Sequence, residues 1–317
     1  MALFPAPHDA ALLAALDVHP GQRVLEIGMG SADTTARIAS LIGDNGLVVS
    51  LALHEEMAYL TCRSLEERGV QNVSAYRMDG VSGYPAQAPY DRIIAYGSVC
   101  KVPLTWLEQL APGGVLVGNL SGNLASVFLR LIKGKGQTSG RGIFLPLEGH
   151  FPVALDHVTT LTSPSSPEEV LAHMPVQEYV ATLDVPSLLK NEAFLFFLQC
   201  EMPQLRRYWR DSGASDARNI LLFDPVLNAS FSSETRDDTC IVRVSGDPAL
   251  WEQIERCYYR WQQARCGCCR CDILSFAILY LGSICLMTWY NSLFCGTGRG
   301  LRAAGCAIAL RARRDCI

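Results

Sequence analysis

One stretch near the N-terminus constrains the fold more than any other part of the chain. Residues 24–27 read as a buried strand, and Gly28-Met29-Gly30-Ser31 follows it at once. A helical pattern of apolar residues then runs to about residue 42. Gly28 permits a sharp turn, and Gly30 permits a ligand to come close to the main chain. The strand, turn and helix therefore predict a binding corner at which the free N–H groups of the helix start face a ligand.

The residues around the glycines indicate which ligand this corner takes. A dinucleotide site has a third glycine three residues after the second, but here that position is Asp33. Glu26, two residues before Gly28, repels phosphate and suits a ligand with an amino group and a sulfonium charge. The pattern therefore favours S-adenosylmethionine. The alternative is a strand-to-helix turn whose glycines serve packing alone.

Strands and helices alternate with short connections over the first 120 residues. Strands are expected at 23–27, 47–51, 73–76, 90–96 and 115–118, and helices at 9–17, 32–42, 55–68 and 103–110. This alternation predicts an α/β fold with a doubly wound, Rossmann-like parallel sheet. Ligands bind such sheets at the carboxyl ends of the strands, where the glycine turn, Leu53-His54 and Asp79 fall.

The regular alternation of strands and helices ends at about Gly122. A domain over 1–121 is therefore expected to be followed by a C-terminal α+β extension over 122–264. Helices are expected at 168–174, 187–199 and 248–263, strands at 220–224 and 239–244, alternating apolar segments at 142–147 and 153–161, and a Ser/Pro-rich linker at 163–167. The last helix carries an apolar stripe at helical spacing that favours burial in a core.

Charge and cysteine usage bound the class of protein. The net charge is −4, but the tail from Arg265 onward carries seven arginines against two aspartates, so the remainder is near −9. An acidic body argues against a nucleic-acid partner. Four of the thirteen cysteines precede residue 250, which is not a disulfide framework, and no secretory signal is present. These features predict a cytoplasmic protein.

The tail over 265–317 has three competing interpretations. Residues 273–298 contain no charge, and the apolar segment 273–294 meets the length criterion for a single-pass membrane helix of about 20 residues. The cysteine cluster at 266–271 is a candidate metal or acylation site, although so tight a cluster does not easily enclose zinc, and no metal site is predicted. The third interpretation is an out-of-frame translation rich in Arg, Cys, Ala and Gly.

Several blocks resemble the protein-L-isoaspartate O-methyltransferase family, and the later part resembles its longer bacterial members. The matching blocks are Ala6-Pro7-His8, the stretch from Pro20 to Ser31, Asp79-Gly80, the stretch from Ala88 to Ile94, and the stretch from Leu107 to Gly114. The resemblance implies methyl transfer from S-adenosylmethionine to an isoaspartyl or aspartyl carboxylate of a protein or peptide, in protein repair or peptide maturation. A membrane partner enters only if the tail is genuine.

The resemblance also implies roles for individual residues. Pro7 and His8 lie in the segment that flanks the substrate carboxylate and are the catalytic candidates. The cofactor-binding candidates are Glu26, Gly28, Gly30, Ser31, His54, Asp79 and Gly80. Asp79 is expected to accept a hydrogen bond from the adenine amino group.

The chain departs from the family pattern at three positions. Ala32 replaces a glycine, Pro5 replaces a serine, and Ala52 replaces the acidic residue that binds the ribose hydroxyls. His54, Glu55 and Glu56 are the nearest candidates to take over that last role. These departures leave open an alternative, a catalytically degenerate methyltransferase fold that serves as a binding module.

Overall fold

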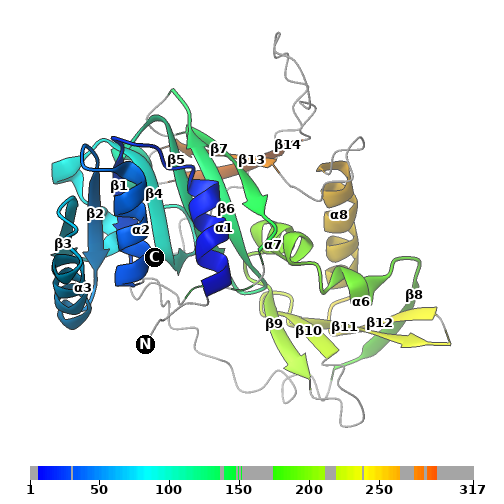
Figure 1. The fold of residues 1–317 in the computed structure, drawn as a ribbon. Helices are drawn as coiled ribbons and strands as arrows, with labels where there is room; N and C mark the ends of the chain where they lie inside the picture. The colour runs from blue at the N-terminus through cyan, green and yellow to red at the C-terminus, as the bar shows by residue number, and fades with distance from the viewer. Residues whose placement is uncertain are drawn as a thin grey trace. The chain divides into compact units, whose positions relative to one another are not determined.

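The chain forms two compact units in the computed structural model (Figure 1). The structure describes residues 6–29, 31–135, 139–147, 149, 151, 174–210, 219–237, 239–264, 275–281 and 284–290. Unit 1 comprises residues 1–121, 127–158 and 270–317, and unit 2 comprises residues 122–126 and 159–269. The linker at 163–167, the apolar segment 153–161, the helix at 168–174 except its last residue, and the cysteine cluster lie outside the described residues.

Unit 1 is built on a nine-stranded sheet with the order β14-β13-β7-β6-β5-β4-β1-β2-β3. Its strands are β1 (Arg23–Ile27), β2 (Leu47–Ala52), β3 (Val73–Arg77), β4 (Tyr90–Val99), β5 (Leu110–Ser121), β6 (Ser126–Lys133), β7 (Ser139–Leu145), β13 (Ser275–Leu281) and β14 (Ile284–Tyr290). Strand β1 pairs in parallel with both β2 and β4, while β3 and β5 extend the parallel part outward. The strand order therefore reverses between β1 and β4, as the doubly wound α/β prediction requires.

Four helices and two short 3₁₀ turns precede or connect the parallel strands of the sheet. They are α1 (Ala6–Leu16), α2 (Ala32–Ile42), α3 (Glu55–Glu67), α4 (Leu104–Gln109), η1 (Gly80–Ser82) and η2 (Pro85–Gln87). Leu12 and Leu16 of α1 and Ile38 and Ile42 of α2 join one buried cluster with residues of β1, β2, β4 and β5. This shared cluster places α1 and α2 on one face of the sheet, in front of the strands in Figure 1.

The sheet continues past residue 121, because β6 and β7 are part of it. The domain boundaries at 121 and 264 remain predictions about which segments fold independently. Strand β7 pairs antiparallel with β13, which pairs antiparallel with β14. The prediction of a membrane helix over 273–294 is therefore wrong for the part of this segment that the structure describes, where two strands stand instead. No helix among the described residues is both long and apolar enough to cross a membrane.

Unit 2 contains a five-stranded antiparallel sheet with the order β8-β12-β11-β10-β9. Its elements are β8 (Val176–Ala181), α6 (Val185–Leu188), α7 (Glu192–Glu201), β9 (Arg206–Arg210), β10 (Asn219–Asp224), β11 (Ala229–Arg236), β12 (Thr239–Ser245) and α8 (Ala249–Ala264). The aromatic stripe of α8 is buried as expected. Trp251 stacks on Phe231 of β11 with ring centroids 5.4 Å apart, and Trp261 meets Phe194 of α7 at 5.3 Å.

Candidate functional site

The turn after β1 is shaped by Gly28 and by the end of β2. Gly28 has φ +76°, a conformation that other residues rarely adopt. The backbone N–H groups of Gly28 and Met29 both donate to the carbonyl oxygen of Leu51, at 3.0 and 2.9 Å. Gly30 lies outside the described residues. The turn is therefore fixed to β2 by the main chain, and this leaves its outer side to a ligand.

Helix α2 begins at Ser31, which caps it. The Ser31 hydroxyl accepts a hydrogen bond from the backbone N–H of Thr34 at 3.2 Å, the usual arrangement at a helix start. Ser31 does not line the pocket described below. Its assignment as a cofactor-binding residue remains a prediction, and its observed role is to start the helix.

Glu26 lies behind the turn and is fully buried. Its Oε2 atom accepts hydrogen bonds from the hydroxyls of Thr35 (2.8 Å) and Ser50 (2.5 Å), whereas Oε1 has no hydrogen-bond partner among the described residues. Burial raises the pKa of Glu26 from its ordinary 4.5 to about 7, against the opposing effect of the two hydroxyls. Glu26 therefore joins β1 to β2 and α2 inside the core, and its orientation of the turn and its contact with a ligand amino group both remain predictions.

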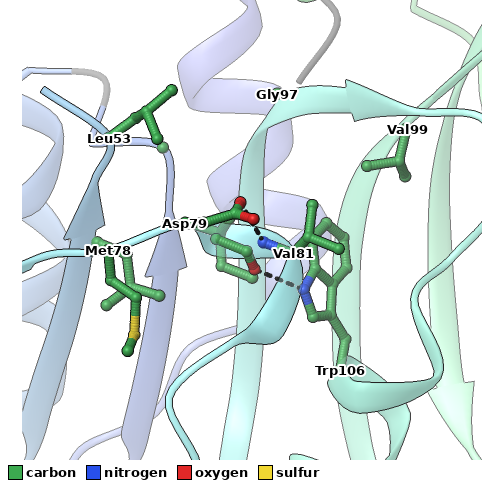
Figure 2. Close-up of a pocket in the computed structure, with 11 residues that line it drawn as sticks. Leu53, Met78, Asp79, Val81, Gly97, Val99 and Trp106 are labelled. Carbon is green, nitrogen blue, oxygen red and sulfur yellow. Dashed lines mark hydrogen bonds between the residues drawn. The ribbon is translucent and has the colours of Figure 1, made fainter. Parts of the chain in front are cut away.

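A pocket opens at the carboxyl ends of the parallel strands, where the strand order reverses (Figure 2). About 600 Å³ of empty space, which includes open solvent, lies between its lining residues. The lining is mostly apolar and comprises Ile27, Gly28, Leu51, Leu53, Met78, Asp79, Gly80, Val81, Gly97, Val99 and Trp106. Among these, Asp79 alone carries an ionisable side chain.

Asp79 stands at the start of η1, directly after β3. Its Oδ1 atom accepts a hydrogen bond from the backbone N–H of Val81 at 3.0 Å, so the carboxylate is both a turn cap and a pocket wall (Figure 2). Gly80 follows because no side chain fits there: a Cβ atom would lie 2.2 Å from Cγ2 of Ile27. The sequence prediction of a site at Asp79-Gly80 thus coincides with the pocket.

Helix α4 holds the η1 turn in place. Trp106 Nε1 donates to the Gly80 carbonyl at 2.8 Å, Thr105 Oγ1 to the Val81 carbonyl at 2.7 Å, and Gln109 Nε2 to the Ser82 carbonyl at 2.8 Å. Leu53 lines the pocket, at the strand end where it was expected, whereas Trp106, Met78, Val81, Gly97 and Val99 line it without having been predicted from the sequence. Position alone was a usable signal for three of these residues, since Gly97 and Val99 end β4 and Trp106 follows it.

His54 does not line the pocket. It precedes α3 without making a side-chain cap, and it is exposed. Ala52, where the family has an acidic residue, is buried in a small apolar cluster with Met29 and Ala58. Glu55, the next candidate carboxylate, is exposed and ion-paired with Arg77 at 3.0 Å. The role of His54 toward a ligand therefore remains a prediction without geometric support.

Pro7 and His8 belong to α1 and do not line the pocket. The His8 ring stacks on Phe128 of β6 with centroids 5.7 Å apart, and the Pro7 side chain lies outside the described residues. The adjacent Asp9 accepts a hydrogen bond from the Thr34 hydroxyl of α2 at 2.9 Å. This bond ties the start of α1 to the helix that follows the glycine turn. The catalytic roles of Pro7 and His8 remain predictions.

The arrangement suits a compact ligand with one flat apolar part and one hydrogen-bond donor. The apolar walls exclude water from such a group, and Asp79 offers an acceptor at the bottom of the pocket. Glycine at position 28 permits the positive φ of the turn, and glycine at position 80 permits the close approach of η1 to Ile27. A general base of the Ser-His-Asp or Cys-His kind does not line the described pocket, so the site fits reactions that need alignment more than proton transfer.

Comparison with known proteins supports this picture. A family model for protein-L-isoaspartate(D-aspartate) O-methyltransferase matches residues 3–142. The protein-L-isoaspartate O-methyltransferase of Methanosarcina mazei is 36% identical over 150 residues, covering 45% of this chain and 61% of the relative. That of Methanothrix thermoacetophila is 37% identical over 154 residues, covering 46% of this chain and 71% of the relative.

Two further comparisons bear on length and fold. Protein-L-isoaspartate O-methyltransferase 1 of Archaeoglobus fulgidus is 42% identical over 113 residues, which cover 35% of this chain and 52% of the relative, so the match to the curated relatives spans between half and three quarters of their length. A solved protein-L-isoaspartate O-methyltransferase superposes with a TM-score of 0.50 at 24% identity, covering 86% of this chain and 77% of that one, which bears on the fold. With the strand order and the matched residues together, the chain belongs to the protein-L-isoaspartate O-methyltransferase family.

Proposed function

We propose that this protein transfers a methyl group from S-adenosylmethionine to an isoaspartyl or aspartyl carboxylate of a protein or peptide. The observation that carries the proposal is the pocket beside Gly28, with Asp79 as its single carboxylate, at the point where the strand order reverses. Open α/β sheets bind nucleosides at this point. The family relatives, which are named for this reaction, support the same assignment.

The residues of the pocket fit an adenosyl group. Asp79 accepts a hydrogen bond from a purine amino group, while Val81, Val99 and Trp106 supply apolar contact for a flat ring. The Gly28 turn leaves the main chain open to the methionine part, and we assign to Glu26, which is bonded to Thr35 and Ser50, the role of orienting that turn. When bound, S-adenosylmethionine supplies an electrophilic methyl carbon.

The reaction requires little proton chemistry from the protein. A carboxylate with a pKa near 4 is already ionised at neutral pH, so no general base is needed to activate it. The carboxylate oxygen forms a bond to the methyl carbon while the carbon–sulfur bond breaks, and the electron pair stays on sulfur. The protein has to align the two groups and exclude water, and this alignment is the main source of rate.

Calorimetric titration of the full chain with S-adenosylhomocysteine tests cofactor binding. Micromolar binding is expected, and no heat at millimolar ligand refutes the proposal in favour of a degenerate binding module. If the ligand binds, transfer of a labelled methyl group to an isoaspartyl peptide is compared with transfer to the aspartyl peptide of the same sequence. Methylation of neither peptide also refutes the proposal, whereas a preference for one separates repair from peptide maturation.

Variants of Asp79 test the residue that defines the site. Asp79→Ser keeps a hydroxyl that can accept from the Val81 N–H but is too short to reach a ligand. We expect it to weaken S-adenosylhomocysteine binding by about 10- to 100-fold, the equivalent of a hydrogen bond to a charged group, with little loss of thermal stability. Asp44→Ala, at an exposed turn after α2, is the matched control and is expected to bind normally. Unchanged affinity in Asp79→Ser contradicts the assignment.

A further inference from the structure

We propose that the pocket recognises its nucleoside through the purine and does not read the ribose hydroxyls, so that it accepts 2′-deoxy and 3′-deoxy nucleosides with little loss of affinity. This inference rests on the proposed function. It assigns the specificity of the same site to the end of β2, where Rossmann-type sites commonly present a carboxylate to the ribose.

The end of β2 carries no hydroxyl acceptor toward the pocket. Leu51 and Leu53 line it with apolar side chains, and Ala52 between them is 3% exposed within the cluster of Met29 and Ala58. The side chain of residue 52 therefore contacts these apolar neighbours and does not line the pocket.

The main-chain acceptors at this strand end are already engaged. The carbonyl oxygen of Leu51 accepts from both Gly28 and Met29, and that of Ala52 accepts from the N–H of Met78 at 2.9 Å. Two donors already use the Leu51 oxygen, so a ligand hydroxyl cannot bond to it without displacing the bonds that shape the glycine turn. The strand therefore offers the sugar a surface of Leu51 and Leu53.

The neighbouring charged groups do not replace the missing carboxylate. Glu55 is ion-paired with Arg77, and its side chain is 80% exposed. His54 is exposed and does not line the pocket. Asp79 accepts from the Val81 N–H through Oδ1, and the proposed function assigns its Oδ2 to the purine amino group. Figure 2 shows Leu53 and Met78 to one side of Asp79, and Val81 and Trp106 to the other.

If the protein makes no hydrogen bond to the ribose hydroxyls, removing a hydroxyl should leave the affinity for the ligand nearly unchanged. A site built to hydrogen-bond a hydroxyl rejects the analogue that lacks it, because a buried protein group then stays unpaired. Among the described residues that line the pocket, Asp79 is the one charged side chain, and it is assigned to the purine, so none of these side chains is left unpaired when a ribose hydroxyl is removed. S-adenosylhomocysteine and its 2′-deoxy and 3′-deoxy analogues are therefore expected to bind the full-length chain within about threefold of one another.

Calorimetric titration with the three ligands tests the inference and separates it from the proposed function. If none of the three binds, both proposals fall. If S-adenosylhomocysteine binds and either deoxy analogue is weaker by about tenfold or more, the proposed function stands and this inference is overturned. Affinities within threefold support it.

A gain-of-function variant tests the position. Leu53 is 43% exposed at the pocket, so Leu53→Asp adds a carboxylate without burying it. We expect Leu53→Asp to favour S-adenosylhomocysteine over the deoxy analogues by about fivefold or more. Leu41→Asp, at a 49% exposed position of α2, adds the same charge away from the pocket and is expected to leave the ratio unchanged. An unchanged ratio in Leu53→Asp overturns the assignment to this strand end.

Discussion

Replacing Glu26 by Gln should remove a specific pH dependence from the stability of unit 1. Folding raises the pKa of Glu26 from 4.5 to about 7, because the carboxyl is fully buried behind the glycine turn. Between these two values the folded state holds a proton that the unfolded state has lost. The contribution of this group to stability is therefore complete below pH 4.5 and falls as pH rises toward 7.

The size of this effect follows from the same pKa. Each pKa unit is worth about 1.4 kcal/mol, so the wild-type chain loses about 3 kcal/mol of stability from this group between pH 4.5 and pH 7. Above pH 7 the loss stops, because Glu26 is then ionised in both states. In Glu26→Gln the side-chain amide has no proton to lose. Its oxygen remains an acceptor for Thr35 and Ser50, although its NH₂ leaves one buried group unpaired, a cost that does not vary with pH.

The measurement is urea unfolding at pH 5, 6, 7 and 8, followed by hydrogen exchange of peptides that cover β1 and β2. The free energy of unfolding of Glu26→Gln minus that of the wild type should increase by about 2–3 kcal/mol from pH 5 to pH 8. Glu55→Gln is the matched control, because Glu55 is exposed and ion-paired with Arg77, and its difference should stay nearly constant. A constant difference for Glu26→Gln across this range would refute the reasoning.

Two further substitutions test the geometry around the turn. Gly80→Ala places a Cβ atom 2.2 Å from Cγ2 of Ile27 and should cost about 1–3 kcal/mol by thermal unfolding; the cost should shrink in an Ile27→Ala background, and an equal cost in both contradicts the contact. Thr34→Val removes the donor to Asp9 and should cost about 1 kcal/mol, whereas Thr34→Ser should keep most of the stability; equal losses in the two variants would show that the hydroxyl makes no contribution.

The parallel part of the sheet and the position of the site were predictable from local sequence. The turn at Gly28 requires a positive φ, which a glycine in the sequence signals. Asp79 comes just after β3, which pairs in parallel with β2, so its place at the carboxyl edge of the sheet also follows from a short stretch of sequence. The doubly wound fold is confirmed by the strand order and by the comparisons. The elements of this part begin and end within a few residues of the predicted positions, except that β4 and β5 are longer.

Position near the end of β4 was a signal for Gly97, Val99 and Trp106, but the contacts that form the rest of the pocket were not predictable in this way. Trp106 reaches the site because α4 packs on η1, which is a tertiary contact between segments 26 residues apart. Leu53 was expected at the ligand end of its strand from its position, but its residue type carries no signal of a binding role, because single exposed leucines are common. The alanine at position 52 signals a missing carboxylate but not that the side chain lies in an apolar cluster.

The C-terminal segment shows why an apolar run alone does not define a membrane helix. The criterion counted length and the absence of charge, whereas the run is rich in strand formers such as Phe276, Ile278, Tyr280 and Trp289. Strands β13 and β14 form from it, with Leu281 paired to Ile284.

In unit 2, strand β11 was not predicted because its second half, residues 232–236, is polar and carries no apolar alternation, although its main chain pairs with β12.

Helix α4 fixes the backbone of the η1 turn independently of the side chain that the turn presents to the pocket. Thr105, Trp106 and Gln109 bind three successive carbonyl oxygens, and these bonds do not depend on the side chains at positions 81 and 82. Val81 faces the pocket while its main chain is held from the other side. A different side chain at position 81 would therefore change the surface of the pocket while these three bonds continue to hold the backbone.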